Sequence, residues 1–360
     1  MTSQFLGRIK VVRDKLDEWE VDAILVGSAS NLRWLSGFTG SFAWLLVSKD
    51  IAALATDSRY WEQARNQAPD FTLNQFGRSV KEEMPEFLVR ENVKRIGIEV
   101  EHITLSQFAQ LKAVEVIDWV KVEDAVTPLR EAKTKEEVEK VRVAAAITDQ
   151  AMEQVPLILK PGMTERELAW NLEVFMREAG ADGMAFPIIV ASGPNGAMAH
   201  HTPSDRQLQV GEPLIVDMGA MINGYNGDLT RSFFIGSEPD QRFDEIYNIV
   251  LAAQVAAING IKAGIMGDAA DSLARDIISD AGYGEEFGHS LGHGVGLDIH
   301  EGPRLSKLAV DQPIPDRSTV TIEPGIYIPG WGGIRIEDLL LVTESGCEYV
   351  SHCEKKPYIS

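Results

Sequence analysis

The chain reads Gly288-His289-Ser290-Leu291-Gly292-His293-Gly294-Val295-Gly296-Leu297-Asp298-Ile299-His300-Glu301 over the stretch that decides its fold. Three of the seven histidines lie here, within twelve residues of one another, and glycines separate them. A glycine costs a helix or strand about 0.5–1 kcal/mol relative to alanine, so this stretch is not expected to form a stable helix. A backbone this permissive indicates imidazoles that are directed at a target rather than packed in a core.

Two aspartates upstream are candidates for that target. Asp217 ends the apolar strand at residues 214–216, and Asp228 follows it after an Asn223-Gly224 turn signal. The two are therefore expected on neighbouring antiparallel strands, within a residue or two of being opposite. A lone aspartate at a strand end is usually a cap, but like charges opposite each other destabilise a sheet, which favours a bound cation.

Two glutamates downstream complete the acidic set. Glu323 closes the strand at residues 319–322, and Glu337 is expected to share one face of a strand at residues 333–341 with Arg335, because side chains alternate along a strand. A surface ion pair of this kind is worth little. The strand continues into apolar residues, however, so Glu337 is expected to be buried, and a buried carboxylate needs a partner or a metal.

Four carboxylates and one imidazole suit two divalent cations, because four negative charges then face four positive charges. Two cations about 3.5–4 Å apart can hold a bridging hydroxide and polarise an attacked carbonyl. Oxygen-rich ligation with one histidine favours Mn²⁺ most of all, then Co²⁺, Fe²⁺ or Zn²⁺, rather than a structural zinc site. The set predicts a two-metal hydrolase.

At these residues the chain resembles the metallopeptidase group that contains methionine aminopeptidase, aminopeptidase P and prolidase. Five motifs occur in the family's order, which is a very specific match. They are Asp217-Met218-Gly219-Ala220, Gly227-Asp228-Leu229-Thr230-Arg231, the stretch at residues 289–301, Glu323-Pro324-Gly325-Ile326-Tyr327 and Gly333-Ile334-Arg335-Ile336-Glu337-Asp338. The resemblance implies an α+β fold, in which a pita-bread catalytic domain at residues 126–360 follows a smaller α/β domain of the creatinase/prolidase type at residues 1–125.

The resemblance also implies the roles of individual residues. Metal ligands are implied at Asp217, Asp228, His293, Glu323 and Glu337. Catalytic or substrate-contacting roles are implied at His200, His289, His300, Glu323, Tyr327 and Arg335, with Glu323 as general base. His201 matches no position of the family and is interpreted as structural. The creatinase branch shares the fold without the ligands, and every ligand is present here, so that branch is not expected.

The implied activity is hydrolysis of the bond between an N-terminal residue and a following proline, by a homodimer. The segments at residues 36–41 and 56–60 resemble aminopeptidase P, whereas a length of 360 residues is typical of prolidases. A dipeptidase needs a cation for the proline carboxylate, and Arg335 is expected to be engaged by the metal cluster already. An Xaa-Pro aminopeptidase that tolerates dipeptides is therefore predicted, with an Xaa-Pro dipeptidase (prolidase) as the alternative.

Three other readings compete. Gly288-His289-Ser290-Leu291-Gly292 matches the nucleophile elbow of serine hydrolases, which needs a strand before it and a helix after it, and glycines occupy both sides. His289 and His293 could form a one-zinc site, but Ser290 stands where zincins place their glutamate base. A non-catalytic binding protein on the same fold is the third reading, and such relatives usually lose ligands.

Composition excludes several other classes. A chain of 360 residues favours two domains, and 44% hydrophobic with 24% charged residues is typical of a globular protein. A formal charge of −20 argues against nucleic acid. The longest uncharged run, residues 183–204, is broken by prolines and glycines, so no membrane span is expected. Two cysteines exclude a disulfide framework, and with no apolar signal segment at the N-terminus a cytoplasmic location is the default expectation.

Hydrophobic periodicity predicts the elements of both domains. Residues 4–122 alternate between helix and strand without a dinucleotide-binding fingerprint. Strands are predicted there at residues 23–26, 44–47, 51–55, 71–75 and 95–99, and helices near 5–19, 31–35, 59–66 and 80–90. The second domain is predicted to be largely antiparallel, and its two helix-then-strand halves indicate a duplicated layout. Its helices are expected at residues 135–159, 164–179, 242–263 and 267–281, and its strands at 186–191, 214–221, 229–235, 319–323, 325–328 and 333–342.

Overall fold

The computed structural model describes the chain apart from residues 1–2, 78–79, 90–92, 161, 237–239 and 360. The chain divides into two compact units, Met1–Arg130 and Glu131–Ser360. Each unit has a hydrophobic core of its own. Among the described residues, every helix is too short or too polar to span a bilayer.

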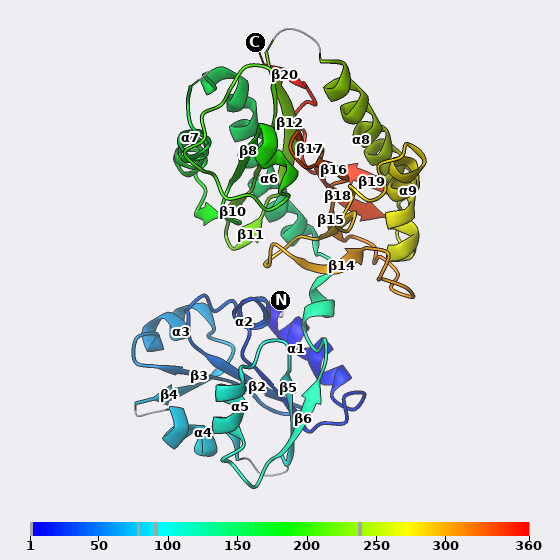
Figure 1. The fold of residues 1–360 in the computed structure, drawn as a ribbon. Helices are drawn as coiled ribbons and strands as arrows, with labels where there is room; N and C mark the ends of the chain where they lie inside the picture. Colours follow the sequence, from blue (N-terminus) through cyan, green and yellow to red (C-terminus); the bar gives the residue numbers. More distant parts are fainter. Residues whose placement is uncertain (1–2, 78–79, 90–92, 161, 237–239, 360) are drawn as a thin grey trace. The chain divides into compact units, whose positions relative to one another are not determined.

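The first unit is a small α/β domain built on one six-stranded sheet (Figure 1). Its strand order is β4-β3-β2-β1-β5-β6, in which β1 pairs antiparallel with β2 and parallel with β5. The sequence of β1 is apolar throughout and every residue of it is buried, as expected of a central strand. The elements are α1 (Gln4–Lys15), β1 (Ala23–Val26), α2 (Ala29–Ser36), β2 (Trp44–Ser48), β3 (Ala52–Asp57), α3 (Trp61–Gln67), β4 (Thr72–Phe76), α4 (Val80–Leu88), β5 (Arg95–Glu99), α5 (Leu105–Leu111), β6 (Asp118–Val122) and the 3-10 helix η1 (Thr127–Arg130).

The predicted α/β class of this domain is confirmed, but α5, β6 and the short 3-10 helix η1 were not anticipated. Helix α5 begins at a capping box, in which Thr104 and Gln107 satisfy each other's backbone N–H groups. That signal was present in the sequence. Strand β6 is half exposed and carries little hydrophobic periodicity, so it is recognisable only from its parallel pairing with β5.

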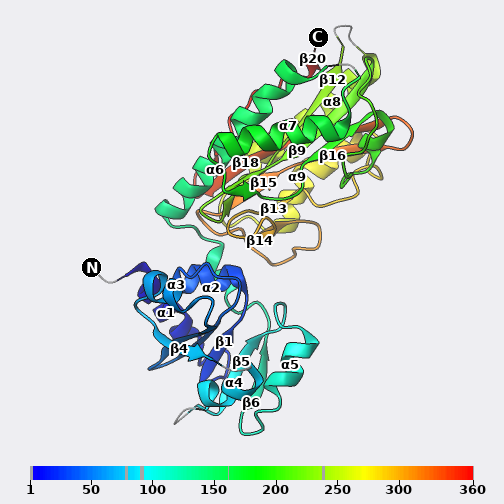
Figure 2. The ribbon, with the colours of Figure 1, turned by 90° about the vertical axis from the view of Figure 1, so that its left-hand side faces the viewer.

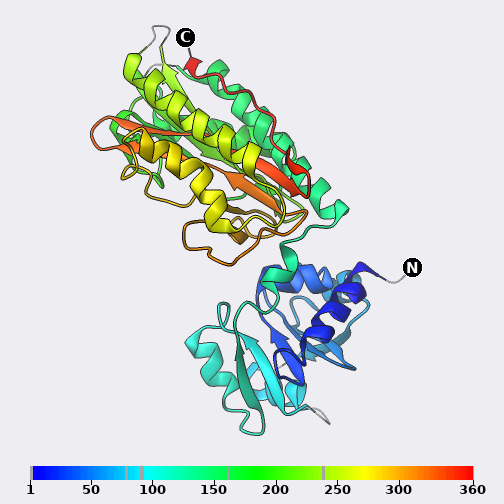
Figure 3. The ribbon, with the colours of Figure 1, turned by 90° about the vertical axis from the view of Figure 1, so that its right-hand side faces the viewer.

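The second unit places two pairs of helices against largely antiparallel sheets (Figures 2 and 3), in which β20 alone pairs parallel, with β12, among the described strands. Helices α6 and α7 share a core with β8, β9 and β12, and helices α8 and α9 share another with β15 and β18. The predicted α+β class is confirmed. The elements are α6 (Lys135–Ile158), α7 (Glu165–Glu178), β7 (Gly183–Met184), β8 (Ile189–Ser192), the 3-10 helix η2 (Gly193–Ala197), β9 (Glu212–Met218), β10 (Ala220–Ile222), β11 (Tyr225–Asn226), β12 (Leu229–Ile235), α8 (Gln241–Gly260), α9 (Gly267–Asp280), β13 (Gly292–Gly294), β14 (Glu301–Leu305), β15 (Thr319–Ile322), β16 (Gly325–Ile328), β17 (Gly332–Arg335), β18 (Asp338–Thr343), β19 (Gly346–Tyr349) and β20 (Tyr358–Ile359).

The two halves of this unit repeat one layout. Leu208 donates its N–H to the carbonyl of Met163 just before α7, and Ile314 donates to Ile265 just before α9. In the first half β8 and β12 flank β9, and in the second half β13 and β18 flank β15. The duplicated layout that the sequence indicated is therefore present in the backbone pairing.

Three strands have bounds that differ from those predicted. The strand expected at residues 186–191 begins only at Ile189. The strand expected at 214–221 breaks at Gly219, where a Cβ would lie 2.0 Å from the carbonyl oxygen of Gly227. The strand expected at 333–342 breaks after Arg335, because the N–H of Glu337 turns to the carbonyl of Thr230 at 3.1 Å. The prediction that Arg335 and Glu337 share one face of a strand is therefore wrong.

Candidate metal centre and substrate pocket

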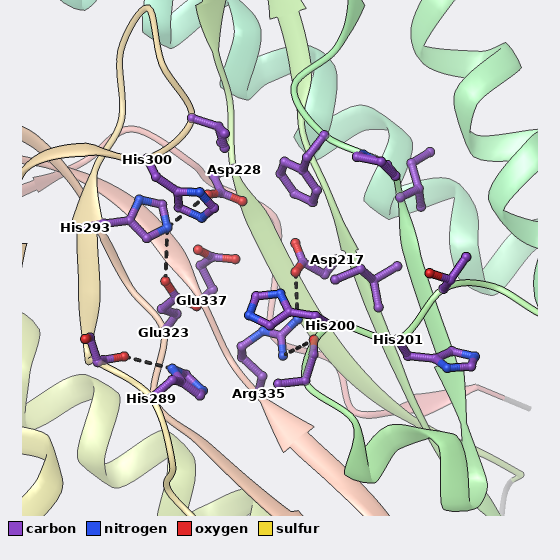
Figure 4. A pocket seen from close by; sticks show the side chains of 18 of the residues that line it. His200, His201, Asp217, Asp228, His289, His293, His300, Glu323, Arg335 and Glu337 are labelled. Carbon is purple, nitrogen blue, oxygen red and sulfur yellow. Dashed lines mark hydrogen bonds and ion pairs between the residues drawn. The ribbon is translucent and has the colours of Figure 1, made fainter. Parts of the chain in front are cut away.

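Three buried carboxylates meet where the two halves of the second unit come together (Figure 4). Asp217 lies near the end of β9, Asp228 directly precedes β12, and Glu337 lies between β17 and β18. Each offers an oxygen within 4.8 Å of the oxygens of the other two. Burial and then the charge of Glu337 raise the pKa of Asp228 well above its usual value. Carboxylates gathered in this way need a counter-charge to stay ionised.

Arg335 supplies one counter-charge. Its Nη2 donates to Asp217 Oδ2 at 2.6 Å, and its Nη1 donates to the hydroxyl of Tyr327 at 2.7 Å. A single guanidinium does not balance the four carboxylates that line this cavity. The second oxygen of Asp217, Oδ1, is buried without a hydrogen-bond partner among the described residues. This donor set fits cations that prefer oxygen ligands.

His293 and Glu323 border the same cluster. His293 is the middle residue of β13, and Glu323 directly follows β15. The Nε2 atom of His293 lies 3.2 Å from Glu323 Oε1 and 3.7 Å from Asp228 Oδ2. Burial opposes a charged imidazole, yet the hydrogen bond and charge of Glu323 raise the pKa of His293. Burial likewise opposes the charge of Glu323, but His293 lowers the pKa of Glu323 to about 2.

Three further histidines face the cavity. His300 packs edge-to-face against the ring of His293, with the ring centres 4.4 Å apart. His289 places Nε2 2.8 Å from the hydroxyl of Tyr327, and His200 lies on the opposite side beside Arg335 (Figure 4). Burial lowers the pKa of both His289 and His300, so both are neutral at pH 7. A neutral imidazole offers one N–H donor and one acceptor nitrogen.

The cavity has a volume of about 390 Å³, within the range of small-molecule sites. Nine of the ten residues singled out in the sequence line it, and the tenth, Tyr327, is buried behind Arg335 and His289. Apolar residues form part of its wall, and sequence reasoning missed them because nothing in their local pattern separates them from core residues. These residues are Phe186, Pro187, Ile188, Ile189 and Ile299.

Ser290 also lines the cavity, but it is not on a nucleophile elbow. No strand directly precedes it among the described residues, and strand β13 follows it instead of a helix. The geometry therefore gives no support to the serine hydrolase reading.

The loop that carries His289 is held by a pair of residues on α9 that sequence reasoning missed. Arg275 donates to the carbonyl oxygens of Phe287 at 2.9 Å and His289 at 2.7 Å. Asp271 pairs with Arg275 and accepts the N–H of Leu291 at 3.0 Å. The i, i+4 spacing of Asp271 and Arg275 was visible in the sequence, but their loop partners were not.

A buried ion pair holds the turn that carries His300. Lys133 Nζ donates to Glu301 Oε1 at 2.6 Å, and both side chains are only 2% exposed. Glu301 Oε2 also accepts the N–H of Asp298. A Cβ on Gly296 would lie 2.3 Å from Glu301 Oε1, so this turn needs a glycine there. Sequence reasoning missed this pair because the two partners lie 168 residues apart.

His201 was interpreted as structural, and its ring turns away from the acidic cluster (Figure 4). Its Nε2 lies 2.8 Å from Oε2 of Glu165, a fully buried residue at the start of α7. His201 still lines the cavity with its neighbours His200 and Thr202.

The site combines buried carboxylates with a neighbouring imidazole, and it opens into a cavity of ligand size. This combination is typical of a metal-dependent hydrolase. The chain belongs to metallopeptidase family M24, whose model matches residues 139–344, and the Creatinase/Prolidase N-terminal domain matches residues 8–132. It is 36% identical to an Xaa-Pro dipeptidase of Pyrococcus furiosus over 95% of this chain and 96% of that one.

Solved structures agree with this assignment. An Xaa-Pro dipeptidase from Bacillus anthracis superposes with a TM-score of 0.96 at 39% identity, covering 99% of this chain and 100% of that one. An X-Pro aminopeptidase from Thermotoga maritima superposes with a TM-score of 0.87 at 37% identity, covering 95% of this chain and 98% of that one. The chain is therefore a proline-directed peptidase of this family, with the pita-bread catalytic fold.

Proposed function

We propose that the chain is an Xaa-Pro dipeptidase, which hydrolyses the bond between an N-terminal residue and a C-terminal proline. The observation that carries the proposal is the nearly full-length similarity to the Bacillus anthracis dipeptidase, with the Pyrococcus furiosus dipeptidase in support. The segments at residues 36–41 and 56–60 and the engagement of Arg335 favoured the aminopeptidase in the sequence analysis. The comparisons favour the alternative, because dipeptidases predominate among the named relatives and structures cited above.

In this proposal five residues hold two divalent cations: Asp217, Asp228, His293, Glu323 and Glu337. When bound, the cations supply Lewis-acid activation of the attacking water and of the scissile carbonyl. The carboxylate of Glu323 accepts the proton of that water.

The neutral histidines act on the other side of the scissile bond. His300 donates an N–H group to the developing oxyanion or to the leaving nitrogen of proline. That nitrogen has no N–H of its own and must gain a proton to leave. The single N–H of neutral His289 is donated to the carbonyl of Ser290 at 2.8 Å, so His289 acts by orienting the hydroxyl of Tyr327, which lies 2.8 Å from its Nε2. The apolar wall that includes Phe186 and Ile299 suits the pyrrolidine ring.

An Xaa-Pro aminopeptidase is the second candidate, and one observation favours it. Arg335 is the only lysine or arginine among the described residues that line the cavity, and it is bound to Asp217. A dipeptide places a free carboxylate beyond the proline ring, where that guanidinium is already engaged. The Thermotoga maritima structure is named for this activity.

Turnover of matched substrates separates the two candidates. The metal-loaded enzyme is assayed with Ala-Pro, Ala-Pro-Ala and a longer Xaa-Pro peptide. A kcat/KM at least tenfold higher for Ala-Pro, about 1.4 kcal/mol of transition-state binding, is expected of the dipeptidase. Equal or higher values for the longer peptides identify the aminopeptidase.

Three further features belong to this proposal. Oxygen-rich ligation supports Mn²⁺ as the resident cation, with Co²⁺, Fe²⁺ or Zn²⁺ as alternatives. The resemblance to proline-directed peptidases supports a homodimer, and the use of only two cysteines, both free thiols, supports the cytoplasm. Elemental analysis and light scattering on the purified protein test the first two features.

A further inference from the structure

We propose that Glu165 is a positioning residue of the reaction, which fixes the loop that carries His200 into the pocket. This inference rests on the proposed function for its kinetic consequence, although the loop contacts stand on the structure alone. Glu165 is the first residue of α7 and its side chain is fully buried. It is not a metal ligand, and it does not line the cavity.

One carboxylate holds both ends of the loop. Oε1 of Glu165 accepts the N–H and the hydroxyl of Ser192, each at 2.8 Å, where β8 ends. Oε2 accepts the N–H of Ser204 at 3.0 Å and its hydroxyl at 2.7 Å. His201 Nε2 lies 2.8 Å from Oε2, and the Asn195 amide donates to both oxygens. The carboxylate of Glu165 thus joins the two ends of the loop formed by residues 193–203.

The tip of this loop forms one side of the pocket. Ala199, His200, His201, Thr202 and Pro203 all line the cavity. Because the neighbouring His201 is turned the other way and bonded to Glu165, the backbone presents His200 towards Arg335 (Figure 4). The orientation of His200 therefore depends on a carboxylate outside the pocket.

The contacts identify a dedicated anion rather than a helix cap. The cap of α7 is already complete, since Thr164 and Glu167 form a capping box there. Burial opposes the charge of Glu165, but the N–H of Ser192 and the hydroxyl of Ser204 lower its pKa to about 2. An ionised carboxylate only accepts hydrogen bonds, which matches the donors that surround it.

The substitution Glu165→Gln keeps the shape and replaces one acceptor oxygen by an NH₂ group, which then faces the N–H of Ser192 or Ser204. The matched control is Glu167→Gln, two residues along the same helix, whose carboxylate accepts the N–H and the hydroxyl of Thr164 and reaches no residue of the loop among those that the structure describes. Both variants are prepared with metal, and metal content is measured. Amide hydrogen exchange of residues 193–204 is compared with that of β9.

In Glu165→Gln, exchange of residues 193–204 is expected to accelerate about tenfold or more while β9 and metal content stay unchanged. The kcat/KM for an Xaa-Pro substrate is expected to fall at least about tenfold. Glu167→Gln should keep the kinetics of the parent. On a His200→Ala background, Glu165→Gln should lower kcat/KM by less than about threefold more, because coupled residues are not additive.

Several results overturn the inference. They are unchanged exchange in residues 193–204, full kinetic additivity with His200→Ala, and an equal kinetic defect in Glu167→Gln. If the parent protein cleaves no Xaa-Pro substrate, the proposed function fails, and exchange of residues 193–204 alone decides the role of Glu165. Should Glu165→Gln not fold, Asn195→Ala removes the two amide contacts and is judged by the same outcomes.

Discussion

His293 Nε2 lies 3.2 Å from Glu323 Oε1, while its Nδ1 lies 3.1 Å from the carbonyl oxygen of Gly294. The strand's own carbonyl thus fixes the imidazole, and Nε2 is the atom that faces the carboxylates. Metal-binding histidines are generally oriented in this way, with the second ring nitrogen donating to a carbonyl or carboxylate. His289 has the same kind of contact from Nδ1 to the carbonyl of Ser290, but its Nε2 faces the hydroxyl of Tyr327 instead of a carboxylate, so the two histidines are distinguishable by experiment.

Alanine substitutions should divide the histidines into two groups. His200→Ala and His300→Ala are expected to keep their metal but to lose activity roughly 10²–10⁴-fold, because each would transfer or orient a proton. His293→Ala is expected to lose both metal and activity. Elemental analysis and kcat measured on the same preparations test this. A metal-free His300→Ala with a metal-replete His293→Ala would show that the ligand assignment is wrong.

Removal of metal should abolish activity reversibly. Chelation followed by dialysis is expected to give inactive protein, and Mn²⁺ or Co²⁺ should restore turnover, because the carboxylates around Asp228 then regain their counter-charge. Asp228→Ala should bind at least one ion fewer per chain by elemental analysis. Full activity in demonstrably metal-free protein would exclude the two-cation model.

The stabilising effect of the ionised Glu165 carboxylate should disappear at acid pH. Its pKa of about 2 in the folded protein lies below the ordinary 4.5, so its contribution to stability is fully present above pH 4.5 and is lost as pH falls towards 2. A shift of this size corresponds to at most about 3 kcal/mol. The difference in free energy of unfolding between the parent and Glu165→Gln should be constant above pH 5 and should shrink below pH 4. Denaturant titrations across that range measure it, and a difference that grows in acid contradicts the assignment.

The pair Asp271–Arg275, which holds the His289 loop, should contribute more folding free energy than a surface ion pair does. Arg275→Ala leaves Asp271 buried without its cation and is expected to cost about 3 kcal/mol of folding free energy, with metal retained and kcat/KM reduced. Arg177→Ala on α7 breaks an exposed pair with Glu173 and should cost only about 0.3–0.5 kcal/mol. Chemical denaturation of both variants makes the comparison. Equal losses of folding free energy in the two variants would mean that the Asp271–Arg275 pair does not hold the loop.

Three of the proposed ligand positions could be predicted from the sequence because each follows a local rule. Asp217 and Glu323 stand at or just beyond the end of an apolar strand, and Asp228 follows a turn in which Asn223 and Gly224 both have positive φ. Such signals extend over a few residues, so one sequence is enough to find them. The two-domain α/β and α+β classes followed from periodicity in the same way.

The supports of the site could not be predicted, because they join residues that are distant in sequence. Glu165 reaches donors 27 to 39 residues away, and Lys133 reaches Glu301 across 168 residues. The break between Arg335 and Asp338 was missed for a similar reason, since it depends on a hydrogen bond to another strand. The choice between aminopeptidase and dipeptidase depends on the far wall of the pocket, which the shared motifs do not encode.

The repeated layout of the second unit means that the acidic cluster is assembled from equivalent positions of its two halves. Ile189 of β8 pairs with Asp217, and Leu291 just before β13 bonds to Glu323, so the two acidic residues are equivalent. By the same pairing, the position of His293 corresponds to Ala191. A half-length ancestor would thus have owned only part of the cluster and completed it by pairing with a second copy of itself. In the present chain only the second half carries an imidazole at this position, so the two halves cannot make equal contributions to the centre.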